Sequence, residues 1–232
     1  MSKVWTEDEL KKVSDGLEGK DPVEALKWAD DNFSREELSL ACSFGPEDVA
    51  LVDMLVKINP KARIFYLDTD LLFKESLDVK DRLIERYGIS PERYGAKTTL
   101  DEMAREFGEE LWKREPDKCC NIRKMLPLAE ALSGLRCWIT GIRRDQAPTR
   151  ANAPVVGWDA KFKLVKVNPL VRWTSEDVWN YIKKNNVPYN VLHDRNYPSI
   201  GCEPCTKPVM PGEDPRAGRW AGFQKTECGL HK

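Results

Sequence analysis

The chain has 232 residues, and its 37 basic and 38 acidic side chains leave a net charge of −1, which does not indicate a general nucleic-acid surface. No apolar run approaches the roughly 20 residues that span a bilayer, and the N-terminal segment has no apolar signal core. These features predict a cytoplasmic protein without a membrane or nucleic-acid partner. Seven cysteines in such a chain fit reduced thiols, metal ligation or catalysis better than a disulfide framework.

Helical and strand patterns alternate along the first 185 residues. Thr6-Glu7-Asp8-Glu9 has the form of a capping box and predicts a helix to about residue 17, and Asp21-Pro22 predicts the start of a second helix. Strands are expected at 38–42, 62–67, near 93–94, at 136–141 and at 162–167, with helices between them and a last helix capped by Thr174. This order predicts an α/β fold with a mostly parallel twisted sheet and helices on both faces.

The C-terminal part of the chain has a different composition. From about residue 185, proline, glycine and charged residues replace the helix and strand patterns. We therefore predict one domain over residues 1–232, ending in an irregular mobile tail over residues 209–232.

Three polar segments follow predicted strand ends, where open parallel sheets bind their ligands. Ser43–Asp48 lies between a strand and a helix, where backbone N–H groups can bind phosphate, although its single glycine also suits an ordinary turn. Asp68–Asp70 is either an N-cap cluster for the next helix or a contact for a ribose or base. Residues 143–150 contain three arginines that are either solvated or hold an anion. If their strands are neighbours, the three loops face one crevice.

Four of the cysteines form two tight pairs, adjacent Cys119-Cys120 and the Cys202-x-x-Cys205 turn. They suit a zinc site, an iron–sulfur site, or a redox dithiol with unrelated neighbours. Consecutive residues on a helix point about 100° apart, so Cys119 and Cys120 converge poorly on the single ion of a zinc site. A cubane cluster spreads its thiolates more widely, which favours iron–sulfur without excluding the other two.

The other three cysteines have different surroundings in the sequence. Cys42 and Cys137 lie in apolar predicted strands and are expected to be buried small hydrophobic residues. Cys228 lies near the C-terminus, with Lys225 and His231 close to it. Such cationic neighbours lower the pKa of a thiol and favour a reactive thiolate, and the alternative is an incidental exposed thiol.

Taken together, these motifs resemble those of the sulfonucleotide reductases, specifically the iron–sulfur type that reduces adenosine 5′-phosphosulfate (APS). The resemblance covers roughly residues 42–231. Its most specific part is the four-cysteine set combined with the terminal Glu227-Cys228-Gly229-Leu230-His231. The other segments that carry it are Ser43–Asp48, Leu67–Thr69, Lys118–Lys124, Gly141–Arg144 and Gly218–Gly222.

The resemblance implies an adenine nucleotide alpha hydrolase-like fold and a role for each motif. Cys119, Cys120, Cys202 and Cys205 would bind one [4Fe–4S] cluster. Cys228 would attack the sulfur of APS, expel AMP and keep an S-sulfonate, from which reduced thioredoxin releases sulfite in sulfate assimilation and cysteine biosynthesis. The implied substrate contacts are Ser43, Phe44, Gly45, Glu47, Asp48, Leu67, Asp68, Thr69, Lys124, Gly141, Arg143, Arg144, Arg150, Arg216, Arg219 and His231.

Other functions stay open at this point. The chain could reduce the 3′-phosphorylated substrate (PAPS) or both substrates, but the usual PAPS form lacks the four cluster cysteines. ATP pyrophosphatases of the same fold resemble each other in a Ser-Gly-Gly-x-Asp-Ser loop, from which Phe44 and Asp48 depart. A non-catalytic adenylate-binding module would not need Cys228. The sequence leaves the oligomeric state open, including a homo-oligomer.

Overall fold

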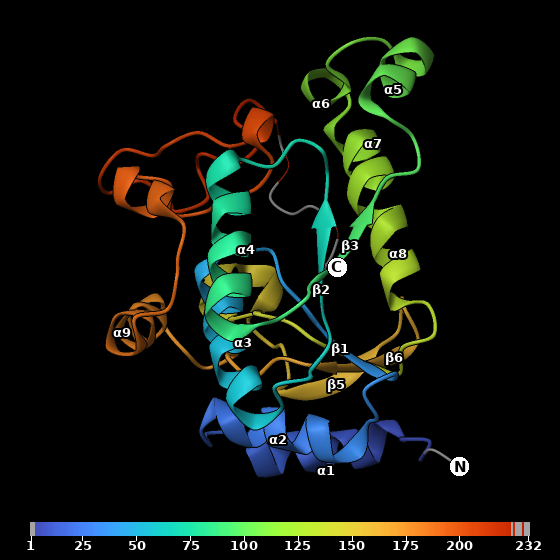
Figure 1. Ribbon diagram of the computed structural model, residues 1–232, viewed down its shortest axis with the longest axis vertical. Helices are drawn as coiled ribbons and strands as arrows, with labels where there is room; N and C mark the ends of the chain where they lie inside the picture. The colour runs from blue at the N-terminus through green and yellow to red at the C-terminus, as the bar shows by residue number, and fades with distance from the viewer. Residues whose placement is uncertain (1–2, 224, 226–228, 230–232) are drawn as a thin grey trace. The chain divides into compact units, whose positions relative to one another are not determined.

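The structure is a computed structural model that describes residues 3–223, 225 and 229. It contains a six-stranded sheet with the order β3-β2-β1-β4-β6-β5 (Figure 1). β1 pairs in parallel with β2 and β4, and β4 pairs in parallel with β6, so the predicted mostly parallel sheet is confirmed. The strands are β1 (Leu38–Ala41), β2 (Ile64–Asp68), β3 (Glu92–Gly95), β4 (Cys137–Ile139), β5 (Val156–Asp159) and β6 (Leu164–Val167).

Strand β5 was not predicted from the sequence, and it is the antiparallel edge of the sheet. It pairs with β6 so that Val156 lies opposite Val167. Lys163, with a φ of 56°, lies in the short connection between the two strands. Gly157 interrupts the apolar residues of this strand, so the sequence has no apolar run here like the one at β2.

Several helices begin where the sequence provides a capping side chain. Complete capping boxes at Thr6, Thr99 and Thr174 start α1 (Glu7–Leu17), α5 (Leu100–Phe107) and α9 (Ser175–Asn185). Asp21 caps α2, whose first residue is Pro22. The remaining long helices are α2 (Pro22–Asn32), α3 (Pro46–Ile58) and α4 (Lys74–Tyr87).

The chain divides into two compact units that interleave in the sequence. The first contains the described residues of 1–66, together with 82–92 and 132–189. Within it, α1 packs on β5, and α3 packs on α2 and α9 (Figure 1). Leu40, Val52 and Ile139 are fully buried in its core, and the expected burial of Cys42 and Cys137 is confirmed.

The second unit contains residues 67–81, 93–131 and the described residues from 190 onwards. Met103, Leu111 and Cys119 form a small apolar core that joins α5, α6 and α7. Among the described residues beyond 190, the structure has short 3₁₀ turns and isolated β-bridges rather than long helices or strands, as the loss of periodicity predicted. Its short elements are α6 (Leu111–Arg114), α7 (Pro116–Cys120), the π-helical turn η1 (Asn121–Met125), α8 (Leu126–Leu132), η4 (Val191–Arg195) and η5 (Glu203–Cys205).

Within the described part of the chain, no helix is long and apolar enough to cross a membrane.

Candidate active site

The first candidate region lies in the first unit, at the turn between β1 and α3. Asp48, in the first turn of α3, accepts hydrogen bonds from the Ser43 backbone N–H at 2.7 Å and from the Ser43 hydroxyl at 2.6 Å. Phe44 has a φ of 63° and is buried, with its ring centroid 5.3 Å from that of Tyr66. The N-cap residue of α3 is Gly45, which has no side chain to occupy the first N–H groups. These groups suit an anionic ligand such as a phosphate.

Gly141, which lies two residues after β4, brings a second loop against this turn. A Cβ atom at Gly141 would overlap the Asp48 carboxylate and would lie 2.8 Å from the Cβ of Glu47. The loops after β1 and β4 are therefore in direct contact, as expected from neighbouring parallel strands.

Acidic and basic side chains lie close together around this turn. Desolvation raises the pKa of the half-buried Asp48 carboxyl to about 6, although the bonds from Ser43 and the nearby Arg150 act in the opposite direction. Arg143 is only 6% exposed, and its guanidinium lies 3.4 Å from Glu47 and 3.2 Å from Asp145. Arg143 and Arg150, two of the three arginines predicted in residues 143–150, thus lie near the turn.

Arg144, the third arginine of this loop, binds Glu18 and the Ala153 carbonyl instead. Its guanidinium donates to both oxygens of Glu18, which follows α1, at 2.7 and 3.0 Å, and to the Ala153 carbonyl at 2.9 Å. A structural role accounts for these three bonds. A substrate contact from Arg144 stays a prediction.

The second candidate region is a pocket lined by all four cysteines of the two pairs, and it lies entirely in the second unit. Cys119 and Cys120 are the last residues of α7, and Cys202 and Cys205 lie around η5. None of the four forms a disulfide. Burial and the neighbouring thiols raise the pKa of Cys119 to about 12. Among the residues that the structure describes, no three His, Cys, Asp or Glu side chains are placed to hold a single metal ion.

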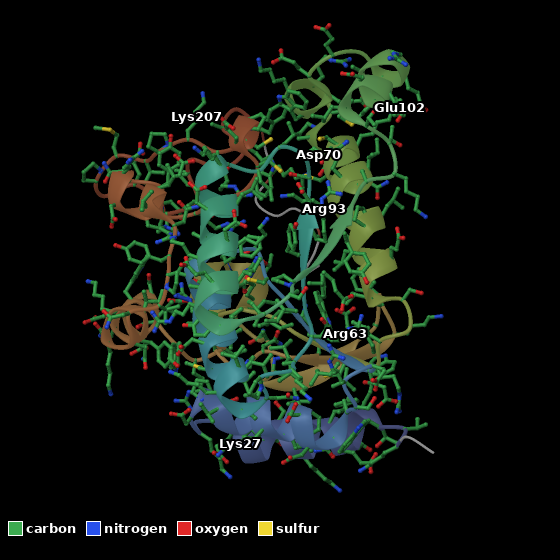
Figure 2. The ribbon with its side chains drawn as sticks, in the orientation of Figure 1. Lys27, Arg63, Asp70, Arg93, Glu102 and Lys207 are labelled. Carbon is green, nitrogen blue, oxygen red and sulfur yellow. The ribbon has the colours of Figure 1, made fainter. Side chains whose placement is uncertain are left out.

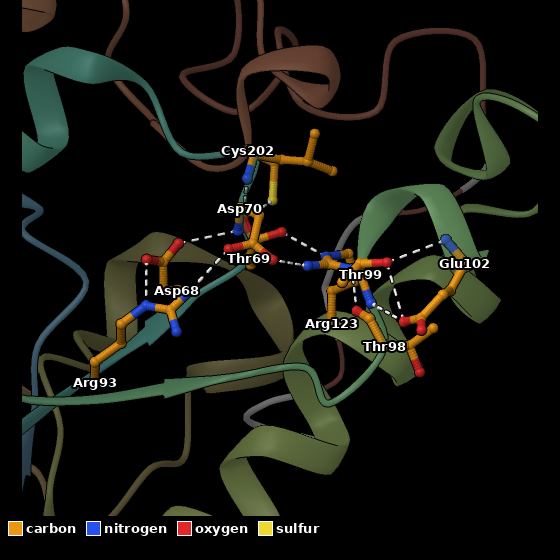
Figure 3. A network of polar contacts seen from close by, with 10 residues as sticks. Asp68, Thr69, Asp70, Arg93, Thr98, Thr99, Glu102, Arg123 and Cys202 are labelled. Atoms are coloured by element: carbon orange, nitrogen blue, oxygen red, sulfur yellow. Dashed lines mark hydrogen bonds and ion pairs between the residues drawn. The ribbon is translucent and has the colours of Figure 1, made fainter. Parts of the chain in front are cut away.

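Arg123 contacts Thr69, Asp70 and Thr98 (Figure 3). It lies in η1, directly after α7, and is only 1% exposed. Its Nε–H donates to the Thr69 carbonyl, its Nη1 donates to the Thr98 carbonyl at 3.0 Å, and its Nη2 forms an ion pair with Asp70. The Thr69 hydroxyl in turn lies 3.3 Å from the Sγ of Cys202. Arg123, which follows Cys119 and Cys120 in the chain, thus contacts Thr69, and Thr69 contacts Cys202 of the second pair.

Residues 68–70, which follow β2, contact both Arg93 and Arg123. Arg93 extends toward Asp70 (Figure 2), and its guanidinium donates to Asp70 at 2.8 Å and to Asp68 at 2.7 Å. Asp70 has a φ of 54°, and its N–H donates to the Asp68 carboxylate at 2.9 Å. Because α4 begins only at Lys74, the alternative that Asp68–Asp70 caps this helix is wrong.

Two of the predicted cations lie at the thiol pocket. Lys124 and Arg219 both line it. Burial raises the pKa of the Cys202 thiol, but Lys124, the Thr69 hydroxyl and Arg219 outweigh burial, so the pKa lies below its ordinary value. Arg219 also donates to the Ser199 hydroxyl and to the Ile200 carbonyl, each at 3.2 Å.

The structure gives fewer contacts, or none, for the remaining predicted site residues. The backbone N–H of Arg216 donates to Asp214 at 2.7 Å. Leu67 lies in β2, at the strand end that leads into the Asp68–Asp70 segment. Cys228 and His231 lie outside the described residues.

Sequence reasoning missed Arg123, Trp112 and Trp220, the last two of which also line the pocket. Arg123 is part of the Cys119–Lys124 motif, but its partners Thr69, Thr98 and Asp70 belong to distant loops. Nothing in the local pattern around Arg123 indicates those partners.

The two regions define an α/β protein with a strand-to-helix turn whose N-cap is Gly45 and with a thiol-lined pocket. The family model of the phosphoadenosine phosphosulfate reductase domain matches residues 37–208. The chain belongs to this family of sulfonucleotide reductases, which confirms the resemblance seen in the sequence.

Relatives with curated names narrow this assignment. The chain is 44% identical to an adenosine 5′-phosphosulfate reductase of Geobacillus sp. (strain WCH70), over 98% of this chain and 97% of the relative. It is 49% identical to adenosine 5′-phosphosulfate reductase 1 of Bacillus subtilis (strain 168), over 92% of this chain and 91% of the relative.

Solved structures agree on the fold. A phosphoadenylyl-sulfate (PAPS) reductase from Candida auris, in a phosphate complex, superimposes with a TM-score of 0.78 at 27% identity, over 90% of this chain and 100% of that one. An FMN adenylyltransferase from Candida glabrata has a TM-score of 0.60 at 15% identity, over 89% of this chain and 68% of that one, and shares the fold alone.

Proposed function

We propose that the chain reduces APS to sulfite and AMP in sulfate assimilation, with Cys228 as the nucleophile and a reduced thioredoxin or a similar dithiol as the reductant. The supporting observation is the pocket in the second unit, where four thiols lie beside Lys124 and Arg219. The near full-length identity to two proteins named APS reductase supports the same substrate.

The chemistry has two steps. The Cys228 thiolate attacks the sulfur of APS, a sulfur–sulfur bond forms, and the bond from that sulfur to the phosphate oxygen breaks, so that AMP leaves with its electron pair. A thioredoxin thiolate then attacks the Cys228 sulfur and expels sulfite, and the second thioredoxin thiol resolves the mixed disulfide. The electrons come from the dithiol, which ends as a disulfide.

The first step brings a thiolate toward an anionic sulfonate. Cations must offset this repulsion and stabilise the charge that develops on the departing AMP. Lys124 and Arg219 at the pocket suit this role, and we assign the same role to Arg216 and His231. Because a guanidinium binds phosphate or sulfate with two parallel hydrogen bonds, the arginines also orient the substrate.

The nucleotide part of the substrate is assigned to the loops of the first unit. The uncapped N–H groups at the start of α3 suit the phosphate of AMP. Gly141 is required there because any side chain would meet Glu47 and Asp48. Arg143 and Arg150 provide positive charge beside the same turn.

We assign a [4Fe–4S] cluster to Cys119, Cys120, Cys202 and Cys205. The four thiols line one pocket, and a cubane, in which each thiolate binds a different iron, spreads its ligands more widely than a single ion does. When bound, the cluster would supply a fixed electrostatic field next to Lys124. Free thiols in this number fit a reducing compartment, so we also propose a cytoplasmic location.

PAPS is the second candidate substrate, because the superposition on the Candida auris enzyme is close. The test is sulfite release by anaerobically purified protein with reduced thioredoxin and either nucleotide. We expect a higher kcat/KM for APS, about four irons per chain, and no turnover by Cys228→Ser. Cys137→Ala, a buried strand position away from both sites, is the control that keeps activity.

Two further measurements on the same protein, incubation with ATP and binding of AMP, could contradict the proposal. Pyrophosphate release from ATP without sulfite would support the ATP pyrophosphatase alternative. Tight AMP binding by an iron-containing protein that releases no sulfite would support a binding module.

A further inference from the structure

Trp112 has a buried hydrogen-bond donor that lacks an acceptor. Its ring lines the thiol pocket together with the four cysteines. The indole Nε1 is buried, yet within the described part of the chain it makes no hydrogen bond. Such a donor is unfavourable in a folded protein, because it has lost its bonds to water and gained none in return. An unpaired donor beside a pocket therefore indicates that a ligand in the pocket supplies the acceptor.

The surrounding chain holds the Trp112 ring in place. Trp112 lies in the short helix α6 and packs against the apolar core in which the preceding residue, Leu111, is fully buried. Arg114, at the end of α6, donates hydrogen bonds to the carbonyl oxygens of Phe107 at 2.5 Å and Glu109 at 3.1 Å. These bonds fix α6 to the end of α5, so the indole is not free to turn its N–H toward water.

The composition of the pocket limits what the acceptor can be. Among the described residues that line it, no side chain carries a carboxylate, amide or hydroxyl oxygen. The side-chain acceptors there are the cysteine sulfurs, and Nε1 bonds to none of them in the protein alone. A sulfur that is bound to a metal carries negative charge, and hydrogen bonds to charged acceptors are stronger than neutral ones.

We propose that Trp112 is a positioning residue for the iron–sulfur group held by the four cysteines, and that its indole N–H donates a hydrogen bond to a sulfur atom of that group. This inference rests on the proposed function, which assigns the cluster to these cysteines. Hydrogen bonds to the sulfurs are one of the features by which a protein tunes an iron–sulfur cluster, and second-shell donors commonly strengthen the binding of a metal.

This role differs from that of the cations at the same pocket. Lys124 and Arg219 carry charge that the proposed function uses to bind the substrate. The indole of Trp112 provides a donor in a fixed direction without adding charge. Loss of its N–H should therefore weaken retention of iron and leave the charge at the pocket unchanged.

The first experiment measures iron retention without any substrate. Anaerobically purified protein is mixed with an excess of EDTA, and the loss of visible absorbance is followed. Trp112→Phe removes the N–H, and 3-benzothienylalanine at position 112 keeps the shape of the two rings but has sulfur in place of the N–H. We expect both proteins to lose iron about fivefold faster than wild type.

A matched control is provided by Trp5→Phe. The Nε1 of Trp5 is also buried without a partner among the described residues, but its ring packs against Trp28 and Phe33 in the first unit. The same substitution there should leave the rate of iron loss equal to that of wild type.

The second experiment detects the hydrogen bond itself. Resonance Raman spectra of the iron–sulfur stretching bands are compared between protein in water and protein fully exchanged into D₂O. Replacing N–H by N–D at a hydrogen-bonded sulfur shifts these bands. We expect a smaller shift with 3-benzothienylalanine at position 112 than in wild type, a result that a role in packing alone would not produce.

The outcomes separate this inference from the proposed function. If the benzothienyl protein retains iron as wild type does, the hydrogen bond is overturned, and faster loss in Trp112→Phe then reports packing alone. An equal D₂O shift in the benzothienyl protein and wild type would also overturn it. If wild-type protein with full iron content forms no S-sulfonate with APS, the proposed function fails. The iron-loss rates would then still decide the role of Trp112.

Discussion

The Thr69 hydroxyl lies 3.3 Å from the Sγ of Cys202, while the Thr69 carbonyl accepts the Nε–H of Arg123 (Figure 3). This residue, directly after β2, thus touches one cysteine pair and the arginine that follows the other. From this contact and the burial of Arg123 we expect both residues to be needed for assembly of the thiol pocket.

Replacing Arg123 by Met should disassemble the pocket. The substitution removes the donor to two carbonyls and leaves Asp70 without one of its two cationic partners. Because Asp70 is partly exposed, we expect a loss of about 2–3 kcal/mol in the free energy of unfolding, together with most of the bound iron. Urea unfolding and iron analysis would measure both. Arg105→Met, an exposed position on α5, is the control, and an iron content equal to wild type would refute the role of Arg123.

Replacing Thr69 by Val tests the hydroxyl alone. Valine has nearly the same shape but cannot hydrogen-bond to the Cys202 sulfur. We expect a loss of about 1 kcal/mol in stability and faster loss of iron in air, followed by visible absorbance. Thr69→Ser keeps the hydroxyl and should behave as wild type. Equal iron loss in the Val and Ser variants would show that the contact is irrelevant.

Replacing Gly141 by Ala should weaken nucleotide binding and leave the thiol pocket unchanged. The new Cβ would lie 2.8 Å from the Cβ of Glu47 and would overlap Asp48, so the turn before α3 must shift. We expect AMP to bind at least about tenfold more weakly, while the iron content is unchanged. Calorimetry with AMP provides the measurement. Gly16→Ala, where a Cβ meets nothing within 4 Å, is the matched control.

The ionisation of Asp48 should make stability depend on pH. Burial raises its pKa from 3.8 to about 6 in the folded chain, so between these values the folded state binds more protons than the unfolded state. The free energy of unfolding should therefore fall as pH rises from about 4 to about 6, by at most about 3 kcal/mol. Asp48→Asn should remove this part of the slope. Urea unfolding at about pH 4 and about pH 6.5, which bracket this window, would detect the difference, and an equal change in stability for the two proteins would contradict it.

Much of the fold could be predicted because its signals are local. Thr6 and Thr174 mark helix starts through capping boxes that span four residues, and apolar runs mark the longer strands. The antiparallel β5 was missed because Gly157 interrupts its apolar residues. Helices α6 and α7 are also short, and they are held by the core around Met103 rather than by strong local patterns.

The site could be predicted only in part, because its geometry depends on contacts between distant segments. The sequence predicted that three loops would face one crevice if their strands are neighbours; β1 and β4 are neighbours, and the loops at Ser43 and Gly141 are in contact. It could not show that Arg144 binds Glu18 or that Arg123 reaches Thr69. Those partners are separated from the arginines by more than a helix or strand of sequence.

The measurement that tests the proposed chemistry most directly is the intact mass of anaerobically purified protein after incubation with APS and no reductant. We expect a gain of one SO₃ group per chain that is absent in Cys228→Ser and is lost when reduced thioredoxin is added. A protein that keeps its iron and binds AMP, yet gains no SO₃ group, would contradict the covalent mechanism.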